Sequence, residues 1–125
     1  MASIAYASPC LPGGADAMRR LAQEVQGPRR AEYDDFHRRV GLLGEAWYIQ
    51  QTPQGDLSIA YLEGDDPLRS VQALARSDHP FDLWFKEQVK LVHGIDFDQP
   101  PAGPLPDVVH DSISRPPRPS GVGGI

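Results

Sequence analysis

An imidazole and a phenol share one apolar helix face in this sequence. The stripe Tyr33, Phe36 and Val40 recurs at helical spacing, and His37 falls on the same side. An imidazole in such a place can serve as a general base near neutral pH, and Tyr33 can move a proton beside it. The structural alternative is that His37 bonds a backbone carbonyl at the edge of the core. The pattern leaves both roles of His37 open.

Aromatic side chains on the predicted strands and the last helix form a candidate ligand pocket. They are Trp47, Tyr61, Trp84 and Phe85, with Tyr48 beside them in the sequence. Aromatic walls with a few polar groups are typical of sites for flat hydrophobic molecules. The alternative is that these residues fill the core, because they also lie at helix and strand spacing.

The segment Ser77–Asp82 (SDHPFD) places two carboxylates and an imidazole at a predicted helix start. Helix capping explains this pattern: Ser77 or Asp78 bonds free amides, and Asp82 lies favourably at the positive end of the helix dipole. A metal site would need a converging set with recognised spacing. No such spacing joins the candidate ligands, so we expect no metal at His79, Asp82, His93 and His110.

No cofactor is expected from the remaining motifs. Cys10 is a lone thiol with no evident activating base, so it is not predicted to be a nucleophile. Neither a dinucleotide-binding glycine motif nor a P-loop is present, and the end GVGGI follows no strand. The two arginine pairs, Arg29-Arg30 and Arg38-Arg39, flank Asp34-Asp35 and predict a mixed charged surface.

Length and composition predict one globular domain. The chain has 125 residues with 40% hydrophobic and 23% charged residues, enough apolar content for a packed core. Its net charge of −5 argues against a nucleic-acid surface. A single cysteine favours a reducing compartment, and no apolar run is long enough to cross a bilayer. The start MASIAYAS lacks a basic signal-peptide region, so we expect a cytoplasmic protein without a membrane partner.

Periodicity and turn residues predict the order of the elements. Residues 3–7 predict a strand, and helices follow over 15–25 and from Pro28 to Val40. Residues 45–51 and 57–63 predict a hairpin around the turn TPQGD. Two further helices start near Pro67 and Pro80, and residues 106–112 are the last candidate strand. Residues 1–112 therefore form the predicted domain, and residues 113–125 a flexible tail rich in proline and glycine.

The order β-α-β-β-α-β predicts an α+β protein of the ferredoxin-like type, a four-stranded antiparallel sheet with split helices on one face. Both faces of the predicted strands carry apolar residues, for example Trp47 and Ile49 on one and Tyr48 on the other. A sheet face open to water is expected to be polar. A second subunit is therefore expected to cover the other face, which predicts a homodimer.

Four segments resemble a known family: GPRRAEY, AWYIQQTPQGDLSIAYLEGDDP, SDHPFDLWFKEQVKLVHGID and QPPAGPLPD. Together they look like small uncharacterised bacterial proteins, frequent in actinobacteria, of the dimeric α+β barrel superfamily, over roughly residues 3–112. The superfamily includes antibiotic-biosynthesis monooxygenases, polyketide cyclases, haem-degrading enzymes and stress-responsive proteins. The resemblance implies a fold and a dimer, and it carries no catalytic residue to a position here.

Two functions follow as expectations. The first is a dimeric small-molecule-binding protein, a cofactor-independent monooxygenase or cyclase acting on an aromatic or polyketide-like metabolite. In it Trp47, Tyr61, Trp84 and Phe85 shape the pocket, and His37 or Tyr33 moves the proton. The alternative is a non-catalytic dimeric module with a structural or regulatory role. An open apolar cavity of roughly 300 Å³ or more would favour the first function, and a filled core the second.

Overall fold

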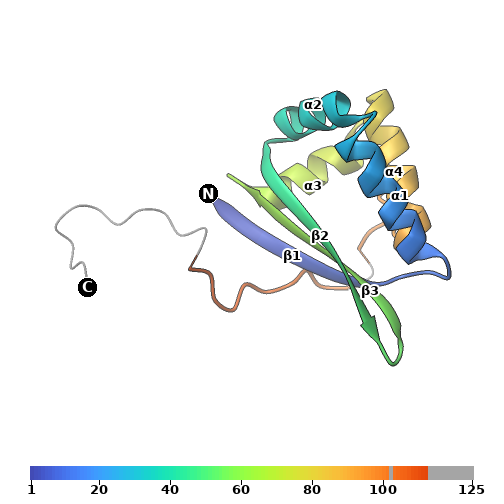
Figure 1. Cartoon of the computed structure of the whole chain (residues 1–125). Helices are drawn as coiled ribbons and strands as arrows, with labels where there is room; N and C mark the ends of the chain where they lie inside the picture. The colour runs from blue at the N-terminus through green and yellow to red at the C-terminus, as the bar shows by residue number, and fades with distance from the viewer. Residues whose placement is uncertain (102, 113–125) are drawn as a thin grey trace, which may run out of the picture.

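In the computed structural model, which describes residues 1–101 and 103–112, a three-stranded antiparallel sheet carries four helices on one face (Figure 1). The elements follow one another as β1 (Ala2–Pro9), α1 (Gly14–Gln26), α2 (Arg30–Val40), β2 (Leu42–Thr52), β3 (Gly55–Gly64), α3 (Pro67–Arg76) and α4 (Pro80–His93). This architecture confirms the α+β class. Every predicted helix is present. Each of the three strands extends beyond the residues that were predicted for it.

The sheet order is β1-β3-β2, with both pairs antiparallel. The predicted hairpin is confirmed: Thr52 pairs with Gly55 at its end. The Thr52 hydroxyl donates to the Gly55 carbonyl at 2.6 Å and accepts from the Gln54 amide at 3.2 Å, which closes the turn. Gly55 has φ 117°, a conformation that residues with a Cβ rarely adopt. The strand order is compatible with a ferredoxin-like fold.

The predicted strand over residues 106–112 does not form: the structure describes this segment as irregular. Pro104 and Pro106 have no amide hydrogen to donate to a sheet ladder, which explains the failure. The segment still approaches β1, because the Ser3 hydroxyl donates to Asp111 at 3.0 Å. The predicted tail, residues 113–125, lies outside the described residues.

The helix ends follow their sequence signals with one correction. Helix α3 begins at Pro67 as predicted, and Asp66 caps it, its carboxylate accepting from the Arg69 amide at 3.2 Å. The cap of α4 is His79, whose Nδ1 accepts from the Phe81 amide at 3.2 Å, so the prediction of Ser77 or Asp78 was wrong. Gly41 ends α2 in the left-handed conformation.

The core lies between the sheet and the helices. Phe36 of α2 and Phe81 and Phe85 of α4 are buried there, with ring centroids 5.3–5.8 Å apart. Helix α1 packs closely on α4: a Cβ added at Gly14 would lie 2.0 Å from the Val92 carbonyl oxygen. Among the described residues, no helix is both long enough and apolar enough to cross a bilayer.

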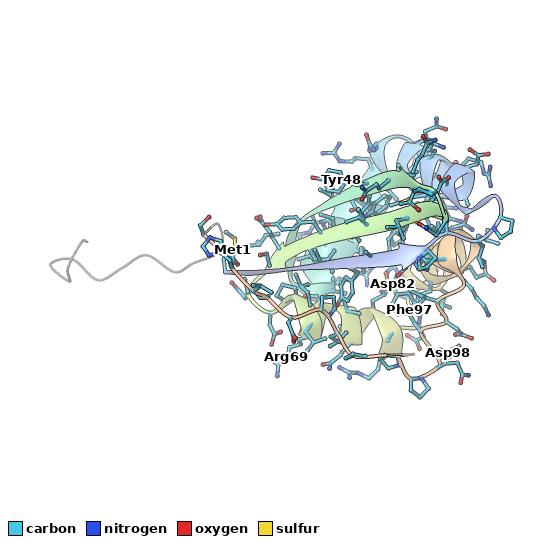
Figure 2. The ribbon with its side chains drawn as sticks, turned by 90° about the horizontal axis from the view of Figure 1, so that it is seen from below. Met1, Tyr48, Arg69, Asp82, Phe97 and Asp98 are labelled. Atoms are coloured by element: carbon cyan, nitrogen blue, oxygen red, sulfur yellow. The ribbon has the colours of Figure 1, made fainter. Side chains whose placement is uncertain are left out.

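The sheet face that carries no helix is rich in apolar side chains. Residues alternate between the two faces of a strand, and Ser58 and Leu62 are buried on the helix side of β3. Ile59 and Tyr61 therefore belong to the opposite, open face. Ile59 pairs with Ala7 on one side and with Tyr48 on the other. Tyr48 is 56% exposed, and Figure 2 shows it from below the sheet.

Candidate acid-base site

Three hydrogen-bond donors converge on the carboxylate of Glu45. The Tyr33 hydroxyl lies 2.5 Å from Oε1, and His37 Nε2 lies 2.8 Å from the same oxygen. Trp47 Nε1 donates to Oε2 at 3.0 Å. Tyr33, His37, Glu45 and Trp47, here called the Glu45 cluster, therefore form one connected polar group.

Local chain geometry explains why these residues meet. Tyr33 and His37 are four residues apart on α2, so they lie one turn apart on the same face. Glu45 and Trp47 are two residues apart on β2 and so share one face of the strand. Gly41, with φ 81°, turns the chain from α2 directly into β2 and brings the two faces together.

The Glu45 cluster is largely shielded from water. The side chains of His37 and Glu45 are 15% and 7% exposed. A carboxylate buried to this degree requires hydrogen bonds to replace water, and the three donors supply them. Burial, and after it the charge of Glu45 and the hydrogen bond to Glu45, raise the pKa of Tyr33 above its ordinary value. The phenol therefore remains a protonated donor at neutral pH.

The hydrogen bonds determine which imidazole nitrogen is basic. An ionised carboxylate accepts hydrogen bonds and donates none, so the proton between His37 and Glu45 belongs on Nε2. In the neutral imidazole the free lone pair then lies on Nδ1. The Tyr33 and His37 rings pack with centroids 4.3 Å apart, and Tyr33 meets Trp47 edge-on at 6.1 Å. These contacts hold the imidazole in one orientation.

The Glu45 cluster borders a cavity of about 480 Å³ between α1, α2 and β2. The charged and aromatic groups come from α2 and β2, whereas α1 contributes Ala22, Val25 and Gln26. The lining consists of Ala22, Val25, Gln26, Arg30, Tyr33, Asp34, His37, Leu43, Gly44, Glu45, Ala46 and Trp47. Its size lies within the range typical of small-molecule sites.

The predicted site residues fall into two groups. His37 and Tyr33 of one predicted helix and Trp47 of a predicted strand lie together at the cavity. Tyr61 lies on the open face of the sheet, where its hydroxyl donates to Glu63 at 2.5 Å. Trp84 and Phe85 do not line the cavity.

Those two α4 residues belong to the packing around the cluster. Phe85 is buried behind it, with its ring centroid 6.3 Å from Tyr33 and 6.1 Å from Trp47. Trp84 packs at the edge of the core, and the Arg29 guanidinium lies 4.0 Å from its ring centroid.

The carboxylate at the centre of the site was missed in the sequence. Glu45 was predicted to begin a strand. Its place two residues before Trp47 was the signal that could have identified it as a buried site residue. A charged residue two positions before a core-facing tryptophan must lie on the buried face as well. Such a residue requires buried partners, which a helix bearing Tyr33 and His37 can provide.

A second buried carboxylate, Asp82, has a structural environment. Its side chain is fully buried, and both its oxygens accept from Arg39 of α2, at 2.7 and 2.8 Å. Ser77 donates to it at 2.5 Å. Burial raises the pKa of Asp82, but the hydrogen bonds from Arg39 and Ser77 outweigh burial and lower it below the usual value. Asp82 therefore ties α4 to α2, beyond its predicted place at the helix dipole.

Cys10 lies beside a second cavity, of about 410 Å³, near the start of α1. Burial and then the negative charge of Asp56 raise the pKa of its thiol. The thiol is therefore protonated at neutral pH and a weak nucleophile. Among the described residues, no three or more His, Cys, Asp or Glu side chains are grouped to hold a metal ion.

Comparisons with protein-family models, with curated proteins and with solved structures found no match to this chain. The resemblance to the dimeric α+β barrel proteins therefore stays a prediction. The function has to be argued from the geometry of the Glu45 cluster and its cavity.

Proposed function

We propose that the protein binds a small organic molecule in the cavity between α1, α2 and β2 and moves a proton on it with His37. The observation that carries this proposal is the convergence of Tyr33, His37 and Trp47 on one buried carboxylate in the cavity wall. A buried ionised group is costly to maintain, and such groups concentrate at functional sites.

The roles of the three polar groups follow from their hydrogen bonds. Glu45 holds the His37 proton on Nε2 and stabilises the imidazolium that forms when Nδ1 accepts a proton. Tyr33 donates to the same oxygen and so replaces water as a partner of the buried carboxylate. Trp47 fixes the other carboxylate oxygen and supplies an aromatic wall.

This arrangement fits the reaction class expected from the sequence. A cofactor-independent monooxygenase or a polyketide cyclase begins by removing a proton from a phenol or from a carbon beside a carbonyl. A neutral imidazole oriented by a carboxylate is suited to that step near neutral pH. The proposed substrate is therefore an aromatic or polyketide-like metabolite small enough for the cavity.

A screen of aromatic fragments by thermal shift tests the binding step, because a ligand of the folded state raises its stability. Ala22 lies in the cavity wall on α1, and its neighbour Gln23 is exposed outside the cavity. Fragments that stabilise the wild-type chain are expected to lose their effect in Ala22→Phe and to keep it in Gln23→Phe. Fragments that act equally on both variants, or a screen without any stabilising fragment, would contradict the proposal.

The alternative function, a non-catalytic dimeric module, is favoured by the apolar open face of the sheet. We propose a second copy of this chain as its occupant. The strands β1 and β3 pair over eight residues. At the usual rise per residue and the usual distance between strands, the face of the three-stranded sheet is about 26 Å long and about 14 Å wide. The projected area of two such faces is only about 730 Å², so side chains beside the sheet have to supply the rest of the roughly 1,200 Å² that a specific assembly buries. The dimer is also compatible with the acid-base function, because Glu45 and Trp47 lie on the helix side of the sheet.

A further inference from the structure

We infer that the cavity beside Glu45 selects an aromatic molecule that carries a positively charged amine over one that carries a carboxylate. This inference rests on the proposed function, since it concerns the ligand of the same cavity. It names a chemical class that the acid-base role alone leaves open.

Glu45 has an acceptor site to spare for a ligand. An ionised carboxylate offers about four lone-pair sites on its two oxygens. Tyr33 and His37 occupy two on Oε1, and Trp47 occupies one on Oε2. One acceptor site on Oε2 therefore remains for a donor of the ligand, and an ammonium group is a strong donor to a carboxylate.

The charge of the cavity lining also favours a cation. Tyr33, Trp47 and a neutral His37 are uncharged donors, so they solvate Glu45 without cancelling its charge. Arg30 is the cation among the lining residues, and its guanidinium pairs with the carboxylate of Asp34 at 3.3 Å. The lining thus holds two carboxylates and one guanidinium, and its net charge is −1. A negative ligand would be repelled, and a positive one attracted.

The aromatic part of the cavity wall favours the same kind of ligand. The rings of Tyr33 and Trp47 meet edge-on beside the carboxylate, with centroids 6.1 Å apart. Aromatic faces attract cations through their quadrupole, and more strongly where water is excluded. A carboxylate next to two aromatic rings therefore favours an aromatic amine through both its charge and its ring.

The test uses three indoles that differ in the group at the end of the side chain: tryptamine is a cation, tryptophol is neutral and indole-3-acetate is an anion. Their dissociation constants for the full chain are measured by NMR titration at about pH 8.5, where an ordinary histidine is neutral. Tryptamine is expected to bind about ten-fold more tightly than tryptophol, and indole-3-acetate more weakly than both.

Three variants locate the preference. Glu45→Gln keeps the shape of the side chain and removes its charge, so the advantage of tryptamine over tryptophol is expected to disappear. Glu63→Gln, a matched change on the other face of the sheet, is expected to leave it unchanged. The Arg30 side chain is 65% exposed, so the Arg30→Gln variant is expected to fold normally. Because this variant lacks the cation of the cavity lining, it is expected to bind tryptamine more tightly.

The outcomes separate the two proposals. Equal binding of the three indoles, or tightest binding of indole-3-acetate, would overturn the amine preference and leave the cavity as a ligand site. A preference for tryptamine that survives in Glu45→Gln would also overturn it. If none of the indoles shifts the resonances of residues that line the cavity, the amine preference is overturned and the proposed function loses its ligand site as well.

Discussion

Arg39 holds Asp82 with two parallel hydrogen bonds, from Nη1 to Oδ2 at 2.7 Å and from Nη2 to Oδ1 at 2.8 Å. The pair links α2, which carries Tyr33 and His37, to the first turn of α4. The carboxylate is fully buried, so its charge depends on this partner. The same guanidinium also donates from Nε to Asp35 at 2.8 Å, which orients it along α2.

Replacing Arg39 by alanine is expected to lower the free energy of unfolding by about 3 kcal/mol, because a buried charge loses its partner. Urea denaturation measures the change. Arg38→Ala is the matched control, since Arg38 is exposed and pairs with Asp35 at 3.6 Å, and it is expected to cost less than about 1 kcal/mol. Equal losses in the two variants would show that the pair contributes no more than a surface contact.

The Asp82 carboxylate also predicts how stability depends on acid. Its pKa is lowered in the folded state, so its contribution is complete above the unfolded-state value of 3.8 and is lost as the pH falls through the lower folded-state value. Wild-type unfolding free energy is therefore expected to fall steeply below pH 3.8. In Asp82→Asn this part of the decline is expected to be absent. Parallel acid dependence of the two proteins in urea denaturation would contradict the assignment.

The contact between α1 and α4 predicts a large effect of one methyl group. Gly14→Ala places a Cβ against the Val92 carbonyl and is expected to cost about 2 kcal/mol or more of stability, because neither backbone can move freely. Gly44→Ala is the control, since a Cβ there meets no atom within 4 Å, and it is expected to be nearly neutral. Thermal unfolding compares the two, and similar melting temperatures would count against the close packing.

The open sheet face predicts the oligomeric state. The wild-type chain is expected to sediment as a dimer at micromolar concentration, and Ile59→Lys as a monomer, because a charge would be buried in the middle of the interface. Leu83→Lys changes an exposed leucine of α4 and is expected to leave the dimer intact. A wild-type monomer, or a dimer that tolerates Ile59→Lys, would remove this face as the interface.

Local signals in the sequence predicted most of the elements. The helical stripe placed Tyr33 and His37 on one face, and the Thr52–Gly55 turn placed β2 beside β3, as the structure confirms. The cap of α4 was assigned wrongly because Ser77, Asp78 and His79 can all accept a backbone hydrogen bond. Choosing among them depends on the path of the chain between α3 and α4.

The candidate site was predicted in part, because its centre depends on tertiary packing. Trp47 and Tyr61 both lie on strands. Which of them reaches the cavity depends on which face of the sheet the helices cover. Glu45 was missed because a lone glutamate at a strand start is usually solvated. Its burial follows from the direct passage of α2 into β2 at Gly41, which places its three donors around it.

The most direct test of the acid-base account is the tautomer of His37, read from the two imidazole nitrogens by proton-nitrogen NMR of the uniformly labelled chain at about pH 8.5. The account predicts a proton fixed on Nε2 and an unprotonated Nδ1, because Glu45 accepts the Nε2 proton. Glu45→Gln is expected to weaken that preference. A proton on Nδ1 in the wild-type protein, or two nitrogens that share it equally, would contradict the proposal that Glu45 makes Nδ1 of His37 the base.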